Sequence, residues 1–370
     1  MAWTRREFTR LGALSTAAIA VPGAAFSGAV PDIFAQQQQE RVGFAVIGLG
    51  VIADHFMRGV KQSQRCKITA LVSGHRDKAE RIAAEYGVPK DSIYSYEDFD
   101  RIRDNKTVQA VYVALPNSMH AEYTIRAAKA GKHVFCEKPM ALSSAECQQM
   151  IDACKTANVK LMIAYRMQYE PLTLKCIEMV RNGKIGDMTA FEGQFGFNIQ
   201  PGVWRTKKAM AGGGSVYDVG IYALQAARMF TGEEPVEIKA VAGTVHKDDP
   251  RFAEMEESVE WSMRFPSGIV ASCASTYGGQ MEGFMRVHGK SGTLEMGPTF
   301  GYDGVTMRGR AKGEHWEESN PEKDPKQFER EADHFAECVQ TGRTPKTPGE
   351  EGLRDLTYIE KIYESAGIKL

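Results

Sequence analysis

Short apolar runs recur along the first half of the chain, and polar turns or helix-like stretches separate them. A short apolar run bounded by turn residues is typical of a buried strand in a parallel sheet. The pattern predicts strands at residues 42–47, 66–72, 108–114, 132–136 and 161–165. A helix is expected at residues 118–130, between the third and fourth of these strands. Strands that alternate with helices predict an α/β fold with a Rossmann sheet.

The second half follows a different pattern, because apolar and polar positions alternate over several successive segments. This alternation predicts strands at residues 188–197, 236–246, 259–265, 269–276, 281–288 and 293–296. Their short connections favour an open-faced, mostly antiparallel sheet with one covered face. Helices are expected at residues 171–182, 325–341 and 349–366. We therefore divide the chain into a Rossmann domain at residues 41–160 and an α+β domain at residues 161–370.

Composition narrows the class of partner. The 370 residues include 46 basic and 47 acidic ones, and the net charge of −1 gives no electrostatic basis for binding nucleic acid. The seven cysteines form no CxxC pair and the eight histidines no HExxH motif, so we expect buried free thiols and no metal site. The remaining expectation is a small-molecule partner.

A glycine-rich segment from Gly48 to Ala53 follows the first predicted strand and opens a predicted helix. Gly48 permits a tight turn, Gly50 lets the backbone approach a pyrophosphate, and Ala53 permits close packing of helix on strand. The start of the helix then offers free backbone N–H groups to the phosphates. The segment, including Leu49, Val51 and Ile52, is therefore expected to bind a dinucleotide.

The end of the second predicted strand indicates which dinucleotide. Enzymes that use NAD usually carry an acidic residue here, which holds the ribose 2′-hydroxyl. This chain has Ser73 and Gly74 instead, followed by Arg76 and Lys78, which suit a 2′-phosphate. Asp77 counts against this interpretation, but it is expected to be an exposed cap of the next helix. The pattern predicts NADP.

The N-terminus has the features of an export signal. Arg5 and Arg6 precede a mildly apolar stretch and then small residues up to Ala29. This order predicts a twin-arginine signal peptide at residues 1–29 and an arm at residues 30–40. The apolar stretch is too short for stable membrane insertion. A nicotinamide enzyme in the periplasm cannot draw on the cytoplasmic pool, so we expect a tightly bound cofactor.

Three further segments carry a resemblance to a known family. They are the run from Leu115 to Asn117, the run from Glu137 to Pro139, and the run from Gly212 to Tyr222. Together with the glycine-rich segment, they resemble the Gfo/Idh/MocA oxidoreductases, named after glucose–fructose oxidoreductase, inositol dehydrogenase and a rhizopine catabolism protein. Most members carry histidine at the position of Tyr222. Tyrosine there is similar to the glucose–fructose oxidoreductase branch and to aldose–aldose oxidoreductases.

The motifs and the resemblance together imply where cofactor and substrate bind. The second domain would carry the sugar on one face of its sheet and form a homo-oligomer, a dimer or tetramer, on the other. The expected cofactor-binding residues are Gly48, Leu49, Gly50, Val51, Ile52, Ser73, Gly74, Arg76, Lys78, Tyr96, Leu115, Pro116, Asn117, His120, Glu137, Lys138, Arg166, Trp204 and Arg205. The expected substrate-binding residues are Lys138, Tyr165, Asp218 and Tyr222.

Lys138, Asp218 and Tyr222 are the expected catalytic residues. Oxidation of a hemiacetal carbon needs a base for the hydroxyl proton and a nicotinamide carbon that accepts the hydride. A free tyrosine titrates at about 10, and a nearby ammonium group favours the phenolate, so Lys138 would support Tyr222 as the base. Asp218 would orient Lys138 and the sugar hydroxyls, and a role as helix N-cap stays open for it.

These residues predict a periplasmic sugar oxidoreductase that works by a ping-pong cycle. One aldose is oxidised at C1 to its lactone, and a second sugar takes the hydride and becomes an alditol. Three alternatives remain: an NADP-dependent aldose dehydrogenase with exchangeable cofactor, an NAD-dependent glycoside hydrolase, and a sugar sensor without catalysis. Tyr222 and the basic residues near Arg76 argue against the hydrolase. The complete set of catalytic residues and the export signal argue against the sensor.

Overall fold

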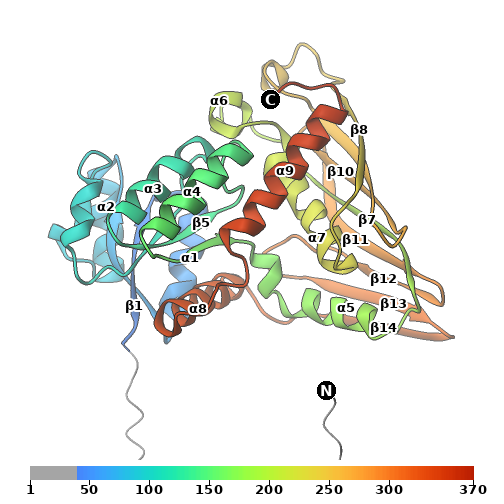
Figure 1. The fold of residues 1–370 in the computed structure, drawn as a ribbon, viewed down its shortest axis with the longest axis horizontal. Helices are drawn as coiled ribbons and strands as arrows, with labels where there is room; N and C mark the ends of the chain where they lie inside the picture. The colour runs from blue at the N-terminus through green and yellow to red at the C-terminus, as the bar shows by residue number, and fades with distance from the viewer. Residues whose placement is uncertain (1–39) are drawn as a thin grey trace, which may run out of the picture. The chain divides into compact units, whose positions relative to one another are not determined.

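The computed structural model describes residues 40–370, and the expected export signal and almost all of the arm lie outside them (Figure 1). The first sheet contains six parallel strands in the order β3-β2-β1-β4-β5-β6, which is the order of a dinucleotide-binding Rossmann fold. Its strands are β1 (Val42–Ile47), β2 (Cys66–Val72), β3 (Ile93–Tyr94), β4 (Ala110–Val113), β5 (His133–Glu137) and β6 (Leu161–Ala164). Its helices are α1 (Val51–Gln62), α2 (Arg76–Tyr86), α3 (His120–Lys129) and α4 (Ser144–Thr156).

The expected boundary after residue 160 falls too early. β6 pairs with β5 along its whole length, so the Rossmann sheet continues to Ala164. Near the other end of the chain, α8 (Lys326–Thr341) returns to this domain and packs against α1 and β1. Figure 1 shows α8 beside α1, although most of the second domain separates them in the sequence. The Rossmann layer is therefore completed by a helix that the sequence pattern assigned to the second domain.

The second sheet has eight strands in the order β14-β13-β12-β11-β7-β10-β9-β8. Only β7 and β10 pair in parallel within it, so the expected mostly antiparallel sheet is confirmed. Its strands are β7 (Met188–Gly196), β8 (Glu237–Gly243), β9 (Ser258–Arg264), β10 (Val270–Thr276), β11 (Met281–Gly289), β12 (Gly292–Met296), β13 (Thr306–Ala311) and β14 (Glu314–Ser319). The sequence pattern missed β13 and β14, because these edge strands carry mostly charged and exposed side chains.

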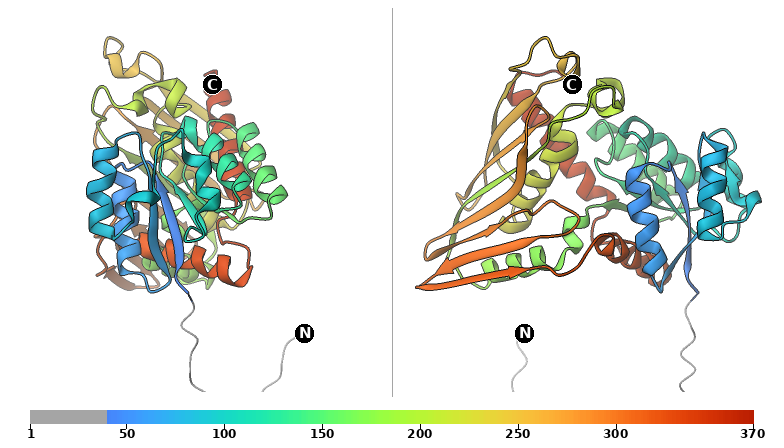
Figure 2. Two further views of the ribbon diagram at one scale, coloured as in Figure 1. Left: turned by 90° about the vertical axis from the view of Figure 1, so that its left-hand side faces the viewer. Right: turned by 180° about the vertical axis from the view of Figure 1, so that it is seen from behind.

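Three helices cover one face of this sheet: α5 (Pro171–Arg181), α7 (Ile221–Thr231) and α9 (Gly349–Ser365). They lie between the second sheet and the Rossmann domain, and the opposite face of the sheet is bare (Figures 1 and 2). A short helix α6 (Lys208–Ala211) and a π-helical turn, Val216–Gly220, precede α7. Within residues 40–370, no helix has the length and apolar character needed to cross a bilayer.

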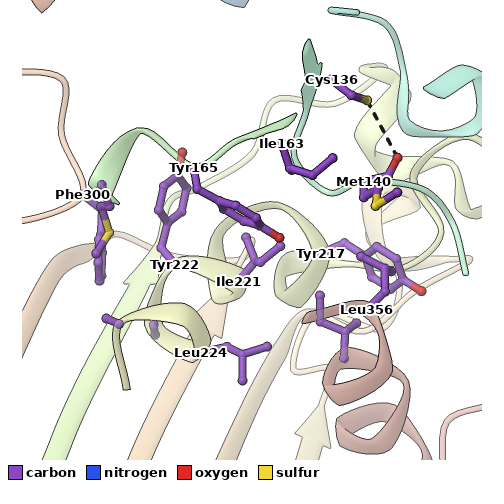
Figure 3. Packing of buried hydrophobic residues seen from close by; sticks show 14 of the residues in the cluster. Cys136, Met140, Ile163, Tyr165, Tyr217, Ile221, Tyr222, Leu224, Phe300 and Leu356 are labelled. Atoms are coloured by element: carbon purple, nitrogen blue, oxygen red, sulfur yellow. Dashed lines mark hydrogen bonds between the residues drawn. The ribbon is translucent and has the colours of Figure 1, made fainter. Parts of the chain in front are cut away.

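A continuous apolar core joins the two sheets. Cys136 and Ile163 from the first sheet, Tyr217 and Leu224 from the segment around α7, and Leu356 from α9 belong to one cluster (Figure 3). All seven cysteines are free and buried, as the sequence indicated. Burial of this apolar surface from both domains is the main favourable contribution to folding. Because one core joins the two domains, the elements that carry the residues of the cleft between them are held in place by shared packing.

Candidate active site

A cleft of about 780 Å³ lies at the C-terminal edge of the Rossmann sheet, where α/β folds bind their ligands. Residues from both domains line it. The glycine-rich segment from Gly48 to Ile52 forms one end, and Lys138, Asp218 and Tyr222 line the other. The structure therefore brings the predicted dinucleotide motif and the three predicted catalytic side chains to one cavity.

The glycine-rich segment fits a pyrophosphate. Gly48 has φ +81°, and a Cβ there would lie 2.4 Å from the carbonyl oxygen of Ala114, so the turn accepts only glycine. Nothing lies within 4 Å of a Cβ built on Gly50, which leaves open space before α1. The first N–H groups of a helix have no partner within the helix, and in α1 no N-cap side chain accepts from them. These donors face the cleft at the place where the motif predicts a phosphate.

The residues at the end of β2 divide into two groups. Ser73, Lys78 and Tyr96 line the cleft as predicted, and His75, which the sequence analysis did not select, joins them. Gly74 lies beside the Tyr96 ring, and a Cβ there would come within 3.2 Å of it. Lys78 is thus the cation that the cleft offers at this end.

Two expectations at the start of α2 are wrong. The Arg76 guanidinium donates to Glu80 and to the carbonyl oxygens of Ile93 and Lys90, so it fixes α2 instead of lining the cleft. Asp77 is exposed, but it does not cap the helix, because His75 occupies the N-cap position. The end of β2 predicts which residues come close to the cleft. It does not predict where their side chains point, because each position of the following helix faces a different direction.

Leu115, Pro116 and Asn117 line the cleft after β4, and His120 contributes to the same wall. His120 is 1% exposed, and its two ring nitrogens lie 2.8 Å from the carbonyl oxygen of Pro139 and 2.9 Å from that of Leu115. Burial lowers the pKa of His120. Its nitrogens therefore contact protein carbonyls, and its role is to join the loop after β4 to the loop after β5.

Lys138 and Asp218 form a partly buried ion pair, with side chains that are 12% and 17% exposed. The Lys138 Nζ donates to the Asp218 backbone oxygen at 2.8 Å and to its Oδ1 at 3.0 Å. Asp218 Oδ2 accepts from the Tyr277 hydroxyl at 2.8 Å and lies 3.1 Å from Arg205 Nε. Burial alone would raise the pKa of Asp218, but Lys138 and Arg205 outweigh it and lower the pKa to about 2. Asp218 is therefore ionised and held by two cations.

The charge on Lys138 is equally secure. Burial alone would lower its pKa, but Tyr222, Asp218 and Glu137 together raise it above the ordinary value. Glu137 lies under the lysine, where its carboxylate accepts from the Tyr112 hydroxyl and from the Lys138 backbone N–H. Lys138 is thus a fixed ammonium at the deep end of the cleft.

Tyr222 lies between two cations. The Lys138 Nζ is 4.9 Å and the Arg166 guanidinium carbon 4.8 Å from the centre of its ring. Arg166 Nε also donates to the Tyr222 hydroxyl at 3.2 Å. Its other N–H groups reach Gly301 O and Gln327 Oε1 at 2.8 and 2.9 Å. Arg166 lines the cleft, as expected of a ligand contact, but it is only 4% exposed and directs these donors to the protein.

Trp204 and Arg205 line the cleft as predicted, and the Arg205 guanidinium carbon lies 4.6 Å from the centre of a Trp204 ring. Tyr165 does not line it. β6 ends at Ala164, and the next side chain packs in the core beside Ile221, where it is 3% exposed (Figure 3). The expectation that Tyr165 contacts a sugar is therefore wrong.

Several cleft residues escaped the sequence analysis. The alternation along β7 could have revealed two aromatic side chains, Phe195 and Phe197, on the wall. The segment from Phe300 to Tyr302, between β12 and β13, also lines the cleft and carries no recognisable motif. Tyr277, which contacts Asp218, also belongs to no recognisable motif. Its contact with Asp218 forms only because β10 packs beside the π-helical turn.

Comparison with known proteins agrees with this architecture. The model of an oxidoreductase family with an NAD-binding Rossmann fold matches residues 42–165, and that of a GFO/IDH/MocA C-terminal domain matches residues 173–295. D-xylose 1-dehydrogenase (NADP(+)) from Haloarcula marismortui is 31% identical over 333 residues, which cover 88% of this chain and 91% of that protein.

Solved structures give the same result. The aldose-aldose oxidoreductase from Caulobacter crescentus, complexed with glycerol, is 43% identical with a TM-score of 0.85, over 90% of this chain and 100% of that one. A 3-ketoreductase from Actinomadura kijaniata, in complex with NADP, has the same fold, with a TM-score of 0.78 and 23% identity over 88% of this chain and 98% of that one. The resemblance drawn from the sequence motifs is confirmed, and this chain belongs to the Gfo/Idh/MocA oxidoreductase family.

Proposed function

We propose that this protein is an NADP-dependent sugar oxidoreductase that oxidises an aldose at C1 and passes the hydride to a second sugar. The observation that carries the proposal is the cluster of Lys138, Asp218 and Tyr222 in the same cleft as the glycine-rich segment. The likeness to an aldose-aldose oxidoreductase and to an NADP-dependent xylose dehydrogenase supports the substrate class. Lys78, and Ser73 in place of an acidic residue directly at the end of β2, support NADP over NAD.

The residues of the chain suit the two proton-dependent half-reactions. When bound, NADP would supply the nicotinamide carbon that accepts the hydride from one sugar and returns it to the next. Tyr222 would take the proton from the C1 hydroxyl during oxidation and return it to the second sugar during reduction. The Lys138 ammonium and the Arg166 guanidinium lie 4.9 and 4.8 Å from the centre of its ring, so two cations are close to the group that would exchange this proton. Asp218 holds Lys138 and would accept a hydrogen bond from a sugar hydroxyl.

The complete cycle would be ping-pong. The first sugar leaves as a lactone, and the second sugar leaves as an alditol, so the cofactor need not dissociate between them. Tight binding of NADP also suits export by the twin-arginine signal predicted at residues 1–29, which would carry the protein into the periplasm with its cofactor already bound. A homo-oligomer formed through the bare face of the second sheet completes this proposal.

One measurement tests the proposal directly. The protein is purified without added cofactor and denatured, and the supernatant is assayed for NADP and NAD. A native sample is then given glucose, and nicotinamide absorbance is followed before and after a second sugar is added. We expect about one NADP per chain, reduced in place by the first sugar and reoxidised by the second.

The second candidate is an aldose dehydrogenase that exchanges its cofactor, which the likeness to D-xylose 1-dehydrogenase favours. A protein that is purified empty and turns over only with excess added NADP would establish that function and exclude the closed cycle. Lack of any aldose-dependent reduction with either cofactor would exclude both.

A further inference from the structure

The segment from residue 297 to residue 305, between β12 and β13, leaves the second sheet and reaches the Rossmann domain. At its centre, the Tyr302 ring lies 4.3 Å from the ring of His55 on α1 and 5.5 Å from that of Phe328 on α8, measured between ring centres. Two elements of the Rossmann layer therefore hold an aromatic side chain that belongs to the other domain.

Arg166 contacts both the backbone of this segment and the Tyr302 ring. It donates through its two Nη atoms to the carbonyl oxygens of Phe300 and Gly301. Its guanidinium carbon lies 4.7 Å from the centre of the Tyr302 ring, and Gln327 Nε2 donates to the Tyr302 carbonyl oxygen at 3.2 Å. The backbone and the ring of Tyr302 are thus both positioned by buried side chains.

The position of Tyr302 in the cleft indicates which part of a bound dinucleotide it would contact. Tyr302 is 37% exposed and lines the cavity together with Gly50 and Ile52 at the start of α1. Its ring packs at a tilt against His55 on that helix, and Arg166 contacts both Tyr302 and Tyr222. A dinucleotide that runs from the N-terminus of α1 to Tyr222 must therefore pass along this ring.

We propose that Tyr302 is a cofactor-binding residue, contributed by the second domain, that contacts the ribose–nicotinamide half of NADP(H) and slows its release. This inference rests on the proposed function, because it requires that the cleft binds NADP(H). A rigid aromatic ring contributes contact area at little cost in side-chain entropy. Because such contacts act mostly on dissociation, Tyr302 provides a way of retaining the cofactor.

Dissociation of NADPH from the purified protein tests the inference. The parent protein and the Tyr302→Ala, Tyr302→Phe and Tyr86→Ala variants are loaded with NADPH and mixed with excess NADP⁺, and loss of the bound fluorescence is followed. Tyr86 lies on α2 outside the cleft and serves as the matched control. We expect release at least about tenfold faster from Tyr302→Ala, which corresponds to about 1.4 kcal/mol. Tyr302→Phe keeps the ring and should stay within about threefold of the parent, and Tyr86→Ala should be unchanged.

Each result separates the inference from the proposed function. Unchanged release from Tyr302→Ala, with a raised KM for the sugar, would make Tyr302 a sugar contact and overturn the inference while the proposed function stands. A parent protein that does not bind NADPH would overturn the proposed function itself. Tyr302→Leu, which keeps apolar volume and removes the aromatic face, repeats the measurement if circular dichroism shows that the alanine variant is unfolded.

Discussion

Two carboxyl groups, one partly buried and one buried, lie close to the run of glycines from Gly212 to Gly214, and they are in opposite charge states. Asp218 follows the run and faces Lys138 and Arg205, which hold its pKa at about 2. Glu256 packs against Gly214, the last glycine of the run, where a Cβ would come within 2.3 Å of Glu256 Oε1. Burial raises the pKa of Glu256 to about 7, although its carboxylate accepts from the Tyr363 hydroxyl at 2.8 Å.

The difference shows what makes a buried carboxylate useful. Desolvation penalises the charged form of both groups, so burial alone does not distinguish them. Cations from other elements decide the outcome: Lys138 comes from the end of β5 and Arg205 from the turn before α6. The neutral phenol of Tyr363 does not replace them. Asp218, which two cations hold, lines the cleft, whereas Glu256 is buried outside the cleft lining and its pKa stays raised although Lys208 acts against the shift.

Removing Lys138 should have the largest effect, because it leaves Asp218 with one cation and Tyr222 without its ammonium partner. We expect Lys138→Met to lower kcat/KM about 10³-fold, or about 4 kcal/mol in transition-state energy. Nicotinamide absorbance with glucose measures the loss. Lys207→Met, an exposed lysine paired with Glu254, is the matched control and should retain activity.

Tyr222→Phe tests the other half of the same pair. It should lose turnover to a similar extent while NADP still co-purifies with the protein, since the ring stays and only the hydroxyl is removed. Near-normal activity in this variant would exclude Tyr222 as the base, and near-normal activity in Lys138→Met would exclude the ion pair from the chemistry.

The sequence predicted those features that have a local pattern and missed those that depend on packing. Apolar periodicity predicted β1 and β2 with their observed bounds, because an uninterrupted buried strand has a clear local pattern. The family motifs located Lys138, Asp218 and Tyr222, whose spacing reflects the loops that carry them. Local pattern does not show which way a side chain turns at the end of a strand, so Tyr165 was misplaced.

The sequence could not predict contacts between residues that lie far apart along the chain. Tyr277 reaches Asp218 and Tyr302 reaches His55 only after the two sheets and α8 have packed together. The burial of Glu256 has the same origin, because α9 places the Tyr363 hydroxyl against its carboxyl group. No local spacing predicts such pairs, and each is set by the packing of a whole domain.

Glu256 should make the stability of the protein fall as pH rises. Glu256 keeps its proton up to about pH 7 in the folded protein and loses it at about 4.5 in the unfolded chain. Between these values the folded state binds more protons, so this group makes the free energy of unfolding fall as pH rises. The loss amounts to at most about 3 kcal/mol. Glu256→Gln should lack it.

Urea unfolding of the parent and Glu256→Gln proteins at pH 5 and pH 8 measures this difference. The stability of the parent relative to the variant should decrease between the two values. Parallel profiles would mean that Glu256 is ionised in the folded protein, and the contrast with Asp218 would then disappear.

Asp218 should give the opposite and smaller dependence. Its pKa is about 2 in the folded protein against 3.8 ordinarily, so its contribution is complete above pH 3.8 and is lost as pH falls toward 2. The shift corresponds to about 2 kcal/mol. Unfolding of the parent and of Asp218→Asn at pH 5 and pH 2.5 should show the parent losing more stability, while the exposed Asp248→Asn follows the parent. Burial raises the pKa of both acids, so burial alone would give both pH dependences the same sign. Slopes of opposite sign would therefore show that neighbouring cations, and not burial, separate the acid in the cleft from the acid behind it.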